Sequence, residues 1–418
     1  MKRADPTRLY YSLEFLLSIP TWVAMSVYLV SVLHFSPLQL VLMGTAMEAS
    51  VFLCELPTGV VADTYSRRLS LIVGYLGMGT AWMLVAVFSA PWAVIALWAL
   101  WGVSYTFTSG AYQAWITDEV GVDKVGRLFL QGNRVSYVGA VVGLVAQVGL
   151  GVWSLRAAVL AGGAVTVLCG LICIAVMPET GFRRRPRAER GSPLAEMRGT
   201  ALAGARYAWA APVILLLVGV ELFMGMSSEA FDRLKEAHFL RDVGLPAVGS
   251  LDPVVWFGLF WLVGMIFGFT GTTWLLRRFE AGGRKLVTSA LMTLTAMELV
   301  AMLAFALTGS TWLAIAALLG VFCARDLAGP LYTIWLNEQI TDSSVRATVL
   351  SISGQANAIG QAGGGPVLGA IGNVWGIPTA LAAGAGAIAP ALGLYGRAIA
   401  HEGREPELAE LPVHPVVD

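Results

Sequence analysis

Long apolar runs recur along this chain, and they constrain its fold more than any other feature. A helix needs about 20 predominantly apolar residues to cross a bilayer. None of the runs shows the alternation of apolar and polar residues that is typical of a membrane β-barrel. Twelve runs meet the length requirement: residues 9–33, 38–62, 69–88, 92–115, 129–150, 155–177, 212–230, 254–276, 286–307, 312–336, 345–371 and 377–399. We therefore predict an all-α integral membrane protein with twelve transmembrane helices.

Composition and charge distribution agree with this class. Hydrophobic residues make up 57% of the chain and charged residues 13%, against about 45–50% and about 25% in ordinary globular domains. With the N-terminus inside, most Lys and Arg residues fall in cytoplasmic segments, and only Arg156, Arg233, Lys235 and Arg241 fall in external ones. The positive-inside rule then places both termini in the cytoplasm of a multi-pass protein of the cell membrane.

The chain divides into two halves at its longest internal polar stretch. We predict an N-terminal six-helix bundle over 1–180, a basic cytoplasmic linker over 181–207, a C-terminal six-helix bundle over 208–400 and a cytoplasmic tail over 401–418. Residues 110–119 and 329–338 share a first Gly, a last Glu and a Trp at nearly the same place, which indicates diverged repeats. In transporters built from repeats, the substrate site lies near the middle of the membrane. The basic cluster 183–187 is either topology charge or a binding site for anionic lipids.

A charged hinge, Gly-Val-Val-Ala-Asp-Thr-Tyr-Ser-Arg-Arg at residues 59–68, joins the second and third runs. It resembles the loop signature of the major facilitator superfamily, although Thr64 is usually basic there and Ser66 is usually Gly. The resemblance covers nearly the whole chain. It implies two pseudo-symmetric bundles of six helices and an alternating-access transporter.

The resemblance also implies roles for the hinge. Asp63 would meet the N-terminus of the eleventh helix, which carries Arg346, when the transporter faces outward, because a carboxylate is stabilised by a helix N-terminus. Gly59 would let the two helices approach closely. Arg67 and Arg68 would bind acids such as Asp118 and Glu119. The alternative is that the hinge only determines topology.

Several ionisable residues lie within the runs, where insertion is costly and function is the default hypothesis. At about 1.5 Å per residue, Glu48 and Glu221 lie at mid-membrane, and Arg325 and Asp326 are also deep. Glu14 lies only about 8 Å from an end. We predict that this set handles protons or substrate; the alternative is a static ion network.

Two arrangements within this set are predicted. Glu48 and Glu55 are seven residues apart and share a helix face, which suggests a polar stripe toward the cavity. The family resemblance implies that helices 1, 4, 7 and 10 line that cavity, so we predict that Arg325 pairs with Glu221. Glu298 is equally deep but lies on the ninth helix, which the resemblance makes peripheral, and we do not assign it a role.

An aromatic stripe runs along the fourth helix. Trp101, Tyr105, Thr108, Tyr112 and Trp115 follow helical spacing, and we predict one continuous face. Packing alone explains such a face as well as a stacking surface for planar or lipophilic substrates does.

These observations predict proton-coupled export of a small amphipathic drug or metabolite. The alternatives are a symporter or uniporter that imports a nutrient, and a membrane sensor. Two features weaken the drug-antiporter pattern: Trp98 stands where many proton-driven members carry an Arg, four residues before Gly102, and the fifth run has Gly139 and Gly143 but no Gly-Pro pair.

No enzyme, cofactor or nucleic-acid partner is expected. The histidines are assigned to loops and tails, and there is no Gly-Lys-Ser/Thr nucleotide loop. The expected partners are a small-molecule substrate, protons and membrane lipids, and a monomer is expected.

Overall fold

The computed structural model describes residues 4–19, 22–182, 202, 206–279, 283–342 and 345–409. The first half comprises α1 (Pro6–Leu17), α2 (Trp22–Ser31), α3 (Pro37–Thr64), α4 (Arg67–Val85), α5 (Pro91–Thr106), α6 (Ala111–Val120), α7 (Val122–Trp153) and α8 (Leu155–Val176). The second half comprises α10 (Pro212–His238), the π-helical turn η2 (Phe239–Val243), α11 (Pro253–Phe279), α12 (Gly283–Leu307), α13 (Thr311–Gln339), α14 (Arg346–Trp375), α15 (Ile377–Gly386) and α16 (Ile388–Ala409).

These helices account for the twelve predicted runs. Eleven segments of the described chain are long and apolar enough to cross a membrane. The remaining run is α14, which has 30 residues and packs against α3 and α10 beside the other spans. The predicted basic cluster 183–187 lies outside the described residues.

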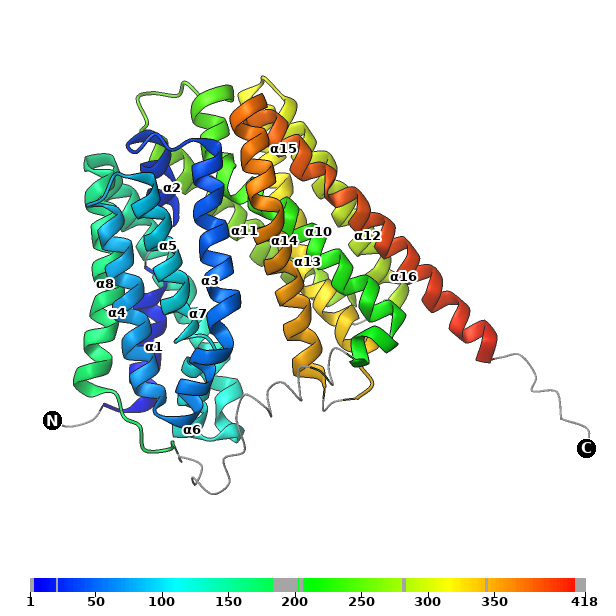
Figure 1. Cartoon of the computed structure of the whole chain (residues 1–418), viewed down its shortest axis with the longest axis horizontal. Helices are drawn as coiled ribbons and strands as arrows, with labels where there is room; N and C mark the ends of the chain where they lie inside the picture. The colour runs from blue at the N-terminus through cyan, green and yellow to red at the C-terminus, as the bar shows by residue number, and fades with distance from the viewer. Residues whose placement is uncertain are drawn as a thin grey trace, which may run out of the picture.

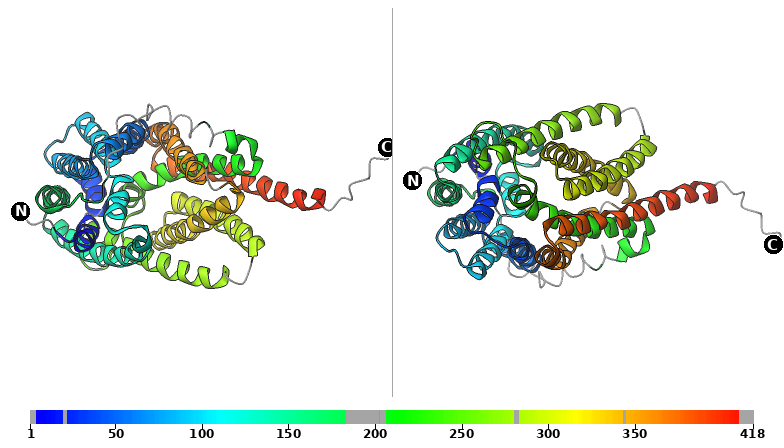
Figure 2. Two further views of the ribbon diagram at one scale, coloured as in Figure 1. Left: turned by 90° about the horizontal axis from the view of Figure 1, so that it is seen from below. Right: turned by 90° about the horizontal axis from the view of Figure 1, so that it is seen from above.

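The spans form two bundles, one from α1–α8 and one from α10–α16 (Figure 1). The bundles meet at the upper end of Figure 1 and diverge toward the lower end, where α1 begins and α16 ends. The views along the other axis show the same separation of the halves (Figure 2). The arrangement is therefore closed at one end, which we call the closed end.

Turn residues position the spans by capping them. Ser36 accepts a hydrogen bond from the backbone N–H of Gln39 while the Gln39 side chain accepts one from the Ser36 N–H, which forms a capping box at the start of α3. Ser66 accepts from the N–H of Leu69 at 3.0 Å and starts α4 only two residues after α3 ends. Short capped connections of this kind turn the chain back into the next span, while α3 itself packs mainly against α5 and α14.

Two predicted spans of the N-terminal half are interrupted. The first span ends as α1 at Leu17 and resumes as α2 at Trp22. The fourth is broken between Thr106 and Ala111, where Gly110 has φ +70°. This left-handed conformation suits glycine because a side chain would be strained there. The predicted fourth helix is therefore not continuous, although Trp101, Tyr105, Thr108 and Tyr112 of its predicted aromatic face still line one cavity.

The seventh span is longer than predicted. The apolar run ends at Ala230, but α10 continues to His238 and η2 to Val243. Arg233 and Lys235, which we assigned to an external loop, thus lie within a helix. His238 was assigned to a loop as well, yet it is buried in α10 and contacts Asp242 and the Phe305 carbonyl at 3.0 and 2.9 Å. Side-chain pairs four residues apart support this extension.

Candidate functional site

A cavity of about 490 Å³ lies between the two halves, and we call it the central cavity. α3, α5 and α14 supply most of its wall. Its lining consists of Met47, Glu48, Val51, Phe52, Glu55, Trp101, Tyr105, Ser109, Ser351, Gly354, Gln355 and Ala358. Glu48 and Glu55 therefore face the same space, as their spacing predicts.

Aromatic rings and hydroxyls surround the two carboxylates. The rings of Trp101 and Tyr105 stack with centroids 5.5 Å apart and planes 7° apart. The Ser109 hydroxyl donates to Glu55 Oε1 at 3.3 Å. This combination of acids, stacked rings and hydroxyls can hold a small molecule that has both a polar or charged part and a planar part.

The break between α5 and α6 positions the Ser109 end of this wall. A broken helix leaves backbone carbonyls without helical partners, and in a membrane these groups must be satisfied by other protein groups. The hydroxyl of Ser70 on α4 donates to the Phe107 carbonyl at 2.7 Å, and that of Thr58 on α3 donates to the Thr106 carbonyl at 3.1 Å. The break is thus supported by both neighbouring spans.

A charged segment of α10 lies against the cavity wall near the closed end. Arg233 Nε donates to Glu229 Oε1 at 3.2 Å, and the Arg233 guanidinium lies 5.4 Å from the centroid of the Trp98 ring. Arg233 also interacts electrostatically with Glu48. α10 lies very close to α3 here: a methyl group added at Gly44 of α3 would be only 1.8 Å from Glu229 Oε1. Arg233 and Glu229 thus link Glu48 of the central cavity to the second half of the chain.

Arg325 does not pair with Glu221, so that prediction is wrong. Its Nε donates to Glu298 Oε1 at 2.6 Å and its Nη1 to Asp232 Oδ1 at 3.1 Å, and its guanidinium lies 4.7 Å from the Phe231 ring centroid. The physical reason is the extension of α10, which brings Asp232 into the span, together with the close packing of α12 against α13. Glu298, to which we assigned no role, is 1% exposed.

The other predicted ionisable residues lie away from the central cavity. Glu221 accepts a hydrogen bond from the Asn357 amide at 2.7 Å, between α10 and α14. Asp326 lies against α11, where a methyl group added at Gly268 would be 2.5 Å from its Oδ2. Glu14 accepts from the Ser136 hydroxyl on α7. Of the five predicted proton or substrate residues, Glu48 alone lines the cavity, and the roles of the others stay predictions.

The hinge between α3 and α4 forms an ion network at the lower end of the molecule. Arg67 binds Asp63 at 3.0 Å and Asp118 at 2.6 Å, so the predicted contact to Asp118 is present. Arg68 instead donates to the carbonyls of Cys173 and Ile174 on α8 at 3.2 and 2.6 Å. Among the described residues, the Arg68 guanidinium thus has no acidic partner, and it is the backbone N–H of Arg68 that binds an acid, donating to Glu179 Oε1 at 3.0 Å.

In the described part of the chain, the other residues of the predicted gate, Gly59 and Arg346, and the acid Glu119 do not make their predicted contacts in this state. Glu119 accepts from the backbone N–H of Gly181 at 2.8 Å. Gly59 has no atom within 4 Å of the place where a Cβ would lie, so no close contact is made there in this state. Arg346 donates to the Ile340 carbonyl at 3.4 Å. The contact between Asp63 and the start of α14 belongs to the outward-facing state and stays a prediction.

The closed end is held by contacts between the two halves. Arg241 Nη2 donates to the Phe35 carbonyl at 2.8 Å, and the backbone N–H of Leu38 donates to Asn373 Oδ1 at 3.0 Å. The glycines of α14 let α3 approach: a methyl group added at Gly369 would lie 3.0 Å from Leu38 Cα, and one at Gly365 2.7 Å from Thr45 Oγ1. The structure is thus sealed at one end of the cavity.

Comparison with known proteins identifies the family. The sequence matches the model of the Major Facilitator Superfamily over residues 9–362. The chain belongs to the major facilitator superfamily. It is 24% identical over 128 residues to an uncharacterized MFS-type transporter, YxaM, of Bacillus subtilis (strain 168), and this match spans 31% of each chain. The alignment thus covers about a third of the length of that relative.

Solved structures of transporters share the major facilitator fold of this chain. The nucleoside transporter NupG has a TM-score of 0.74 at 13% identity, with 95% of this chain and 99% of that chain covered. A bacterial homolog of the human lysosomal transporter Spinster, in an inward-facing and occupied conformation, has a TM-score of 0.68 at 15% identity, with coverage of 95% and 97%. A peptide transporter POT in complex with sulfate has a TM-score of 0.69 at 15% identity, with coverage of 96% and 94%.

Sequence reasoning missed four charged residues that the fold brings together: Glu229, Asp232, Arg233 and Glu298. One signal was present. Glu229 and Arg233 are four residues apart, as are His238 and Asp242, and such pairs favour a helix that continues past the apolar run. For Glu298 the signal was its depth in an apolar run. We gave that depth no weight, because the family resemblance makes the ninth helix peripheral.

Proposed function

We propose that this protein is a secondary transporter that exports a small amphipathic cation bearing an aromatic ring, in exchange for protons. The family makes it a transporter, and the direction, the coupling and the substrate are our proposal. The observation that carries it is the lining of the central cavity. Glu48 and Glu55 share this space with the stacked rings of Trp101 and Tyr105, and none of the described lining residues is a Lys, Arg or His.

Competition for one carboxylate explains why exchange is favoured over cotransport. A carboxylate within a membrane is neutralised either by a proton or by the positive charge of a bound molecule. If both bind at Glu48 or Glu55, each displaces the other, and protons entering the cell drive the cation out. Arg233 offsets part of the negative charge at Glu48, whereas Glu55 has a hydroxyl partner in Ser109. We therefore expect Glu55 to carry the larger share of the cation's charge.

The orientation of the cavity follows from the distribution of positive charge. Arg67 and Arg68 at the start of α4 and Arg346 at the start of α14 lie at the lower end, where α1 begins and α16 ends. The positive-inside rule assigns this end to the cytoplasm of a cell-membrane protein, so both termini are cytoplasmic and the closed end is external. The described state then faces inward, ready to collect substrate from the cytoplasm. Because one chain supplies both halves of the cavity, we expect the monomer to transport without a cofactor.

Proton release on ligand binding tests the proposal. Benzyltriethylammonium is added to the purified protein in weakly buffered detergent solution, and the released protons are measured with a pH indicator. We expect release from the wild type, and loss of release in Glu55→Gln or Glu48→Gln. Asp326→Asn is the matched control, because Asp326 lies against α11 rather than in the cavity.

Two results would contradict the proposal. Binding without any proton release would exclude exchange at these carboxylates. Release that persists in both Gln variants but disappears in Asp326→Asn would move the proton site to α13 and leave the cavity acids without the role proposed here.

A further inference from the structure

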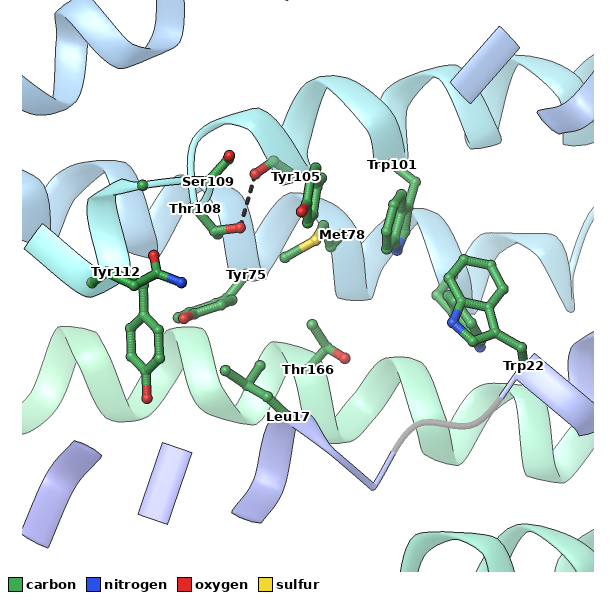
Figure 3. A pocket seen from close by; sticks show the side chains of 13 residues that line it. Leu17, Trp22, Tyr75, Met78, Trp101, Tyr105, Thr108, Ser109, Tyr112 and Thr166 are labelled. Atoms are coloured by element: carbon green, nitrogen blue, oxygen red, sulfur yellow. Dashed lines mark hydrogen bonds between the residues drawn. The ribbon is translucent and has the colours of Figure 1, made fainter. Parts of the chain in front are cut away.

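A second cavity, of about 360 Å³, lies inside the N-terminal bundle, and we call it the side chamber (Figure 3). Its lining residues come from the first, third, fourth and sixth spans. Both interrupted spans border it: Leu17 and Trp22 stand at the two sides of the first break, and Thr108 to Gly110 belong to the second. Described residues beside both breaks therefore line one space. Interrupted helices in membrane proteins are tolerated where they line a cavity.

The chemistry of the side chamber differs from that of the central cavity. Six of its lining residues are aromatic: Trp22, Tyr75, Trp82, Trp101, Tyr105 and Tyr112. The polar groups among the described lining residues are hydroxyls, the indole N–H groups of the tryptophans and one amide, and no Asp, Glu, Lys, Arg or His is among them. A space lined in this way favours a planar uncharged group, because aromatic rings stack on one another and no charged group is desolvated.

Trp22 is placed to contact such a group. Its ring centroid lies 4.9 Å from that of Trp82 and 5.5 Å from that of Trp101, both in edge-to-face geometry. It remains 41% exposed although it lies in the middle of a span. Figure 3 shows its ring together with Trp101 and Tyr105 along the chamber. The aromatic cluster is thus only partly used for packing.

The side chamber and the central cavity share a wall. Trp101, Tyr105 and Ser109 line both spaces. Tyr105 is 41% exposed, so its ring is accessible. A molecule that has a charged end and a ring can therefore place the charge at Glu48 and Glu55 and the ring beyond the Trp101–Tyr105 pair.

We propose that the side chamber is a second compartment of the substrate site, and that it binds the uncharged aromatic ring of a transported cation. The inference rests on the proposed function, since the charged end is held by the acids of the central cavity. It makes the substrate an elongated cation with a flat ring at one end, rather than a compact one.

A chamber-filling variant tests this compartment. Thr166 lies on α8 and lines only the side chamber of the two cavities. We expect Thr166→Phe to raise the Kd of (4-phenylbutyl)triethylammonium, an elongated cation with a ring at its far end, about tenfold, which corresponds to about 1.4 kcal/mol of binding free energy. The Kd of tetraethylammonium, which has the same charge and no ring, should stay within about twofold. Leu168→Phe is the control, because Leu168 is on the same helix and 45% exposed.

The outcomes separate the two proposals. Equal effects on both ammonium ions, or no effect on either, would overturn the side-chamber inference and leave the proposed function standing. If neither cation binds to the wild type, the proposed cationic substrate fails and the inference fails with it.

Photolabelling of the wild type gives a test that does not depend on folding of a variant. A benzophenone-bearing triethylammonium ion is photolysed with the protein, and the labelled peptides are identified by mass spectrometry. We expect labels on α4 and α8, at residues such as Met78 and Thr166. Labels confined to α3 and α14 would place the ring in the central cavity and contradict the inference.

Discussion

Some buried charged residues in this transporter are stabilised by oppositely charged partners on other helices. Arg325 is bound by Glu298 and Asp232, and the second oxygen of Glu298, Oε2, has no hydrogen-bond partner within the described structure. When one member of a buried ion pair is removed, the other is left as an uncompensated charge, which is more destabilising than removal of both. The effect of substituting one residue therefore depends on which partner remains.

Single and double substitutions at Arg325 give the first prediction. We expect Arg325→Met to lower the free energy of unfolding by about 3–5 kcal/mol, because the buried Glu298 loses its ion-pair partner. Adding Glu298→Leu should restore most of this loss. The measurement is the thermal unfolding midpoint in detergent. The control is Arg325→Met with Glu221→Gln, which should restore nothing; restoration by this pair in place of the first would revive the Arg325–Glu221 pairing.

The sequence predicted residue positions better than residue partners. Glu48 and Glu55 were correctly placed on one face because their spacing along one helix decides it. The partner of Arg325 could not be found in this way, because it depends on how α10, α12 and α13 pack together. Helix periodicity contains no information about contacts between helices that are distant in sequence.

At the scale of elements, apolarity predicted the spans but not where they break or end. All twelve runs correspond to helices, since length and hydropathy are sufficient to define a span. The break at Gly110 was not predicted, because the chain has 47 glycines and the sequence does not show which of them adopts a positive φ. The end of α10 was placed at Ala230, where apolarity stops, although charged residues within the protein continue the helix.

Helix α14 gives the second prediction, because its glycines differ in what surrounds them. A methyl group added at Gly360 would lie 2.0 Å from the Leu222 carbonyl oxygen on α10, whereas one at Gly363 would have no atom within 4 Å. We expect Gly360→Ala to lower the free energy of unfolding by about 1–3 kcal/mol, as overpacking does. Gly363→Ala should leave it unchanged or raise it by up to about 1 kcal/mol, because alanine favours a helix more than glycine does. Equal thermal unfolding midpoints for the two variants would show that α14 does not pack against α10 as described.

At the scale of the whole molecule, the proposed transport cycle requires the two halves to exchange contacts at one end for contacts at the other. Arg241 ties η2 to the Phe35 carbonyl of the opposite half at the closed end. A hydrogen bond from a charged group contributes about 1.5–3 kcal/mol. Its loss should therefore favour the state that is open at that end and closed at the hinge.

Distance measurements across the lower end test this third prediction. Spin labels are attached at Leu69→Cys on α4 and Ala347→Cys on α14. Of the four free cysteines, the partly exposed Cys54 and Cys323 are replaced by Ser, and the buried Cys169 and Cys173 are kept. We expect Arg241→Ala to increase the population with the shorter label distance about tenfold, which is the effect of about 1.4 kcal/mol. Arg156→Ala, at a cation on α8 in the N-terminal half, is the control. If both variants keep the distance distribution of the parent protein, Arg241 does not hold the closed end.

Transport driven by a pH gradient tests the central claim most directly. Proteoliposomes are prepared with an acidic interior, the membrane potential is clamped with potassium and valinomycin, and uptake of benzyltriethylammonium is followed. Proton exchange predicts accumulation inside vesicles that contain the wild type, and its loss in vesicles that contain Glu55→Gln. Accumulation that instead requires an acidic exterior would show cotransport of protons and cation, and uptake that ignores the gradient would show a uniporter; either result would contradict the account.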